Sequence, residues 1–77
     1  MDAEWNLVTL QDALAALAET IDEIEDAPDE AATLMEALMP TVYAKLNYAW
    51  NTRQVGPSAI DTTDHNELVA WPRDLKL

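Results

Sequence analysis

The chain has 77 residues, with 15 Asp and Glu against 4 Lys and Arg, and therefore a formal net charge of −11. It contains no Cys, which excludes a disulfide scaffold and any zinc or iron–sulfur site held by cysteine. The acidity argues against direct binding to nucleic-acid phosphates, while a hydrophobic content of 49% predicts a single folded domain over residues 1–77.

The first predicted helix covers about residues 9–26. Thr9 and Asp12 have the spacing of a capping box at its start, and alanines favour helix formation along its length. Large apolar side chains recur at intervals of four and three residues, which is typical of a narrow packing seam. We expect this seam to lie in the core or in a dimer interface; it consists of Leu10, Leu14, Leu17, Ile21 and Ile24.

The second predicted helix covers about residues 28–55 and contains Pro40. Its apolar residues keep the same phase before and after Pro40, and the proline itself falls on the polar side. This pattern favours one kinked helix over two separate helices. The connection before Pro28 is short enough to predict an antiparallel hairpin, and Gly56, followed by another proline, ends the helix. The seam continues in this helix through Leu34, Leu38, Val42 and Leu46.

The C-terminal residues, 57–77, form a predicted tail that packs on the hairpin or on a second subunit. Asp64 and Glu67 have capping-box spacing, which favours a short helix over 65–70 that ends before the next proline. The same residues are also compatible with an extended arm, and periodicity does not separate the two for so short a run.

The second predicted helix is the longer one, so its last ten or so residues extend beyond the first helix. This overhang carries Leu46, Ala49, Trp50 and Val55. We expect it to be covered by Trp5, by a second subunit, or by the apolar residues of the tail, which are Ile60, Leu68, Val69, Trp71 and Leu75. A two-helix hairpin buries each helix on one side only, so we expect a homodimer that completes a four-helix bundle.

Acidic residues are concentrated around the predicted turn between the helices. The cluster consists of Glu19, Asp22, Glu23, Glu25, Asp26, Asp29 and Glu30. A calcium loop of the EF-hand type requires a central Gly, which this segment lacks. The cluster is therefore interpreted as a solvated helix end, with a docking surface for a basic protein or a weak cation site as alternatives.

His65 is the only His in the chain and has Asp61, Asp64 and Glu67 near it in sequence. Catalytic zinc sites usually take three protein ligands, commonly with more than one His or Cys. We therefore predict no metal site and expect His65 to be a capping or surface residue.

One edge of the second helix mixes aromatic and amide side chains, a combination that is enriched at protein interfaces. It consists of Tyr43, Asn47, Trp50 and Gln54. Two interpretations stay open: a partner surface, or the border of the internal core with its polar tips in water. With Glu19, Asp22, Glu23 and Asp26, this edge makes up the predicted partner surface. Arg53 falls among the apolar positions and is expected to meet a carboxylate or to extend into water.

Catalytic constellations are not recognisable in the sequence. Ser58 is the only Ser and lacks an elbow motif, and the single Gly excludes a phosphate loop. We predict no catalytic residues, no cofactor and no membrane span, and we expect a cytoplasmic location. The predicted function is a non-catalytic protein–protein interaction or regulatory module that homo-oligomerises through the seam. The alternative is a nucleic-acid mimic that inhibits a DNA- or RNA-binding protein through its acidic face, and adaptation to high salt would also explain the acidity.

Overall fold

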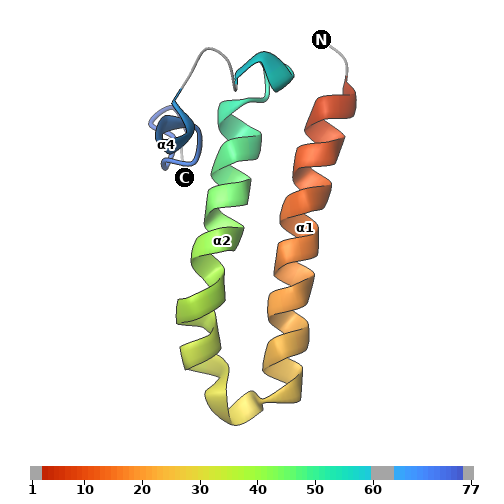
Figure 1. Cartoon of the computed structure of the whole chain (residues 1–77), viewed down its shortest axis with the longest axis vertical. Coiled ribbons are helices and arrows are strands. Elements are labelled where there is room, and N and C mark those ends of the chain that lie inside the picture. The colour runs from red at the N-terminus through yellow and green to blue at the C-terminus, as the bar shows by residue number, and fades with distance from the viewer. Residues whose placement is uncertain (1–2, 60–63, 76–77) are drawn as a thin grey trace.

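The computed structural model describes residues 3–59 and 64–75, which form two long helices packed as an antiparallel hairpin (Figure 1). Helix α1 covers Ala3–Asp26 and helix α2 covers Ala31–Asn51. This described part of the chain contains no strand, so the predicted all-α hairpin is confirmed. The molecule is a rod with extents of 43, 25 and 23 Å. Neither long helix has an apolar stretch long enough to cross a membrane.

Helix α1 begins at Ala3 rather than near residue 9, so the predicted cap at Thr9 was wrong. The Thr9 hydroxyl lies inside the helix and donates to the carbonyl of Asn6 at 3.1 Å. A Thr followed three residues later by an acid looks the same inside a helix as at its start. The extra turns bring Trp5 alongside the end of α2, where its Nε1 donates to Thr52 Oγ1 at 2.9 Å. The expected overhang of α2 is thus partly covered by α1 itself.

The hairpin turn contains a short 3-10 helix, η1, at Pro28–Glu30. Helix α2 then continues through Pro40, which has no N–H to donate to the carbonyl of Glu36. Both residues are exposed, so water can satisfy that carbonyl. The prediction of one helix through this proline is confirmed. The helix ends at Asn51 rather than at residue 55. Gly56 has a φ of 75° and opens the 3-10 helix η2, Gly56–Ser58. It takes the expected left-handed conformation but does not end α2, because the chain already turns at Thr52.

Small side chains line the contact between the two helices. Ala13, Val42 and Ala49 are 3%, 2% and 6% exposed, and Thr20 is also buried. Thr20 satisfies its hydroxyl by donating to the Ala16 carbonyl at 2.9 Å. The largest fully buried side chain among the described residues is Thr52. The hairpin therefore has a thin core, because the helices meet through their smallest residues.

The predicted Leu/Ile seam of α1 does not fill this core. Leu10, Leu14 and Ile21 are 53%, 63% and 48% exposed, and Leu17 is also exposed, whereas Ile24 is half-buried. In α2, Val42 is buried, Leu34 and Leu38 are half-buried and Leu46 is exposed. The α1 row that meets α2 consists of the residues that immediately precede the large ones. They are Thr9, Ala13, Ala16 and Thr20, which have the same 4, 3, 4 spacing. Of the two places expected for the α1 seam, the exposed residues do not lie in the core of the hairpin, because small side chains allow closer approach of the helices, and the dimer interface stays a prediction.

The tail forms a short helix, α4, at His65–Leu68, which decides between the two conformations left open by the sequence. Asp64 is its N-cap, and its side chain accepts from the Asn66 amide at 3.2 Å. Leu68 and Pro72 are buried, so the tail packs beside α2 (Figure 1). The predictions for Ile60 and Asp61 fall outside the described residues.

Candidate functional site

The C-terminal end of α4 is capped by two asparagine side chains from α2. Asn51 Nδ2 lies 2.8 Å from the Leu68 carbonyl oxygen and 2.9 Å from that of Ala70. Asn47 is 9% exposed, and its Nδ2 donates to the Val69 carbonyl at 3.0 Å. The last carbonyls of a helix have no partner inside that helix, so side chains or water must satisfy them. Asn47 and Asn51, one turn apart on α2, therefore form a docking site for the backbone of the tail.

Asp74 is held by Trp50, near the end of α2, and by Arg53, just beyond it. Trp50 Nε1 donates to Asp74 Oδ1 at 2.9 Å, and Arg53 Nη2 lies 2.8 Å from Asp74 Oδ2. The guanidinium also stacks 4.0 Å from the centre of the Trp50 ring. Further along the tail, the rings of Trp71 and Tyr43 meet edge to face at 6.4 Å. The carboxylate expected for Arg53 is thus present, and it comes from the tail of the same chain.

The predicted partner edge is consequently occupied, in large part, by the protein's own tail. Tyr43, Asn47 and Trp50 all contact tail residues, whereas Gln54 is exposed. The sequence left this edge open as a partner surface or as the border of the core, and the tail was one of three candidates to cover the overhang that contains Trp50. The spacing of Asn47 and Asn51 on one helix face was the available signal, and it was missed because asparagine also suits a solvent-exposed edge.

The attachment of Asp74 is expected to depend on pH. The hydrogen bond from Trp50, and after it the one from Arg53, lowers the pKa of Asp74 below its ordinary value of 3.8. A carboxylate with a lowered folded-state pKa stabilises the docked tail above its unfolded pKa, and this contribution is lost as pH falls through the folded value. We therefore expect the tail to loosen below about pH 4, seen as a change in tryptophan fluorescence. The step should disappear in Asp74→Asn and persist in Glu67→Gln, and its persistence in Asp74→Asn would contradict the assignment.

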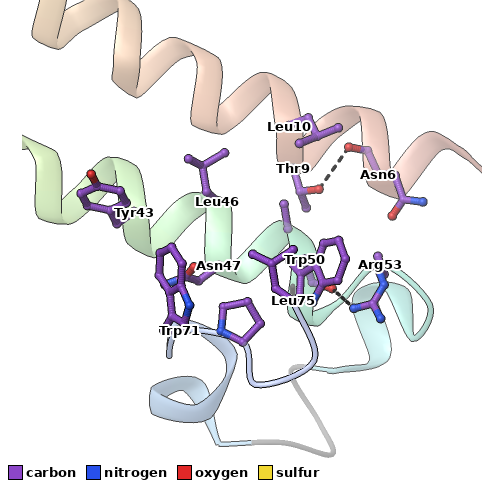
Figure 2. Close-up of a pocket in the computed structure, with 12 residues that line it drawn as sticks. Asn6, Thr9, Leu10, Tyr43, Leu46, Asn47, Trp50, Arg53, Trp71 and Leu75 are labelled. Atoms are coloured by element: carbon purple, nitrogen blue, oxygen red, sulfur yellow. Dashed lines mark hydrogen bonds between the residues drawn. The ribbon is translucent and has the colours of Figure 1, made fainter. Parts of the chain in front are cut away.

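An open pocket of about 480 Å³ lies between α1, α2 and the tail (Figure 2). Leu10 borders it from α1, Leu46 and Trp50 from α2, and Trp71 and Leu75 from the tail. Asn6 also lines it, and the Oδ1 atom of Asn6 is buried without a hydrogen-bond partner. The tail thus completes the walls of a largely apolar pocket at one end of the hairpin.

This pocket opens onto a longer exposed surface, here called the apolar face. Leu10 belongs both to the pocket and to the row of exposed residues on α1, and helical geometry keeps that row on one side of the hairpin. Tyr43 and Leu46 of α2 border the same pocket and are 50% and 44% exposed. The apolar face is defined as Leu10, Leu14, Leu17, Ile21, Tyr43 and Leu46.

The opposite side of the hairpin is more polar. Lys45 Nζ pairs with Asp12 Oδ2 at 2.7 Å, and both residues border a second open pocket, of about 740 Å³. His65 also borders this pocket; it is exposed, and its ring lies 6.4 Å from that of Tyr48. Within residues 3–59 and 64–75, no three His, Asp or Glu side chains are grouped so that they could hold a metal ion.

The acidic residues form a tip at the turn of the hairpin, far from the tail (Figure 1). All seven residues of the predicted cluster, from Glu19 to Glu30, are exposed, as is Glu36. No Lys or Arg occurs before Lys45, so the tip has no basic residue of its own. Comparisons with protein-family models, with curated proteins and with solved structures found no match to this chain. The features that bear on its function are therefore its own surfaces: the apolar face, the docked tail and the acidic tip.

Proposed function

We propose that the protein is a small, acidic, non-catalytic interaction module that forms a homodimer through its apolar face. The exposure of four large aliphatic residues in one row of α1 carries this proposal: Leu10, Leu14, Leu17 and Ile21. Contiguous apolar surface of this kind on a soluble protein marks a site of association. Scattered single leucines would not support the same conclusion.

The thin core explains why a second copy suits this surface. The hairpin closes over small residues such as Ala13 and Ala49, so several of its large apolar side chains, Leu14 among them, stay largely exposed. Small domains with insufficient cores are commonly completed by oligomerisation. A stable interface buries about 800 Å² on each partner, and the long side of a rod of 43 by 25 Å is wide enough for that. Two such hairpins would form a four-helix bundle.

Replacing Leu14 with Glu tests the proposal, because Leu14 is the most exposed member of the row and contributes little to the hairpin itself. A two-fold interface loses the side chain from both copies. We therefore expect dimerisation to weaken at least about 100-fold while the helical circular dichroism signal is retained. Molar mass by light scattering and sedimentation at several concentrations would measure this.

Gln11→Glu is the matched control, since Gln11 is an exposed residue outside the apolar face and the substitution adds the same charge. It should leave the dimer unchanged. A wild-type protein that remains monomeric at all accessible concentrations would contradict the proposal. Equal effects of both substitutions would also contradict it, because they would indicate general charge repulsion.

Nucleic-acid mimicry is the second candidate, and the exposure of the carboxylates at the acidic tip supports it. Carboxylates on a rigid helix can occupy a basic surface that normally holds phosphates. The expected result is capture of basic nucleic-acid-binding proteins from lysate at low salt and their release by a salt gradient. Replacing Glu19, Asp22, Glu23 and Asp26 by the corresponding amides should abolish capture, and unchanged capture would exclude this function.

A further inference from the structure

We infer that the pocket at the tail end of the apolar face is the docking site for Ile21 of a second copy, so that the two hairpins pack antiparallel. This inference rests on the proposed homodimer and adds its orientation and its contact residues. Leu10 stands at the mouth of the pocket, whereas Ile21 lies at the far end of the same row, near the acidic tip. In the antiparallel arrangement, Ile21 of one copy meets Leu10 and the pocket of the other.

The row has the geometry that such an arrangement needs. Leu10 and Ile21 lie roughly 16 Å apart along α1 at 1.5 Å per residue. A two-fold axis between Leu14 and Leu17 superimposes each end of the row on the opposite end in the partner. Two-fold interfaces are reciprocal, so both pockets would be filled by the same contact. The pocket of about 480 Å³ falls within the size range of sites that hold apolar groups.

The distribution of charge decides between the two orientations. The tip carries eight exposed acidic residues and no basic ones: Glu19, Asp22, Glu23, Glu25, Asp26, Asp29, Glu30 and Glu36. Packed helices lie about 8–10 Å apart, which is close to the Debye length at physiological salt. A parallel dimer would therefore place two unneutralised tips within range of mutual repulsion.

An antiparallel dimer avoids this repulsion. With the axis between Leu14 and Leu17, the two Asp26 residues at the ends of α1 lie roughly 30 Å apart along the helices, several times the Debye length of about 8 Å. Each tip instead lies beside the other end of the partner, where Lys45 and Arg53 are already paired with Asp12 and Asp74. The repulsion between the two acidic tips thus favours the same orientation as the pocket.

Disulfide trapping tests the orientation, and the chain is suited to it because it has no Cys of its own. The variants are Leu10→Cys and Ile21→Cys, both at exposed positions, with one variant tagged so that mixed and self-linked dimers differ in mass. A disulfide needs Cα atoms about 4.4–6.8 Å apart, which the antiparallel dimer provides between the two different positions. Under mild oxidation of the mixture, we expect the mixed dimer to exceed self-linked dimers about ten-fold.

The possible results separate the two proposals. Efficient self-linking of each variant alone would show a parallel dimer, which overturns the inference and leaves the homodimer standing. A dimeric mass without any cross-link would overturn the stated contact between the two positions. A monomeric wild-type protein, measured by light scattering before oxidation, would overturn both proposals. Circular dichroism of each reduced variant confirms that the hairpin is retained.

Discussion

Replacing Val42 with Asp is expected to unfold the hairpin. Val42 is 2% exposed and lies on the face of α2 that also buries Ala49. A buried charge without a partner costs about 3–5 kcal/mol, which is comparable to the total stability of a small domain. Thermal and urea unfolding followed by circular dichroism would measure the loss.

Thr41→Asp is the matched control for this substitution, because Thr41 is the preceding residue and is exposed. It introduces the same charge into the same helix, and its melting curve should stay close to that of the wild type. A Val42→Asp protein that melts like the control would show that α2 does not present Val42 to α1. The comparison therefore tests which face of α2 forms the core.

Replacing Asn51 with Ala is expected to release the tail without unfolding the hairpin. The substitution removes the amide that donates to the Leu68 and Ala70 carbonyls and leaves those groups without a side-chain partner. Such losses cost about 1–3 kcal/mol, which corresponds to a roughly 5- to 150-fold fall in hydrogen-exchange protection of the docked segment. The amides of Leu68 and Val69, which donate to Asp64 and His65 carbonyls, report this directly.

Gln54→Ala controls for the loss of an amide side chain from the same end of the chain, since Gln54 is exposed. Its exchange pattern should match that of the wild type. Unchanged protection of Leu68 and Val69 in Asn51→Ala would indicate that the contacts of Asp74 and Trp71 are sufficient to hold the tail. Loss of the α1 and α2 signals would indicate instead that the tail supports the whole hairpin.

The ends of helices and turns were predictable wherever the backbone preference of one or two residues determines them. The end of α1 at Asp26, the proline-marked turn and the left-handed Gly56 follow from backbone preferences that depend on few neighbours. The start of α1 was not predictable in this way. The residues before Thr9 are compatible with several conformations, and the contact of Trp5 with Thr52 joins segments 47 positions apart.

The residues that dock the tail were also predictable only in part. The residue types of Tyr43, Asn47 and Trp50 left two interpretations open, a partner surface or the border of the internal core. The identity of that segment depended on where Asp74 and the carbonyls of α4 come to lie, which no local pattern encodes.

The amino-acid sequence by itself determined that the protein is an acidic helical hairpin, because helix periodicity, proline and glycine positions and net charge are local or additive properties. Only the tertiary structure decided which side of α1 faces α2. Two rows with the same 4, 3, 4 spacing compete for that contact, one of large residues and one of small ones. The small row lies at the contact because it lets the helices approach closely, and this leaves the large row exposed as the apolar face.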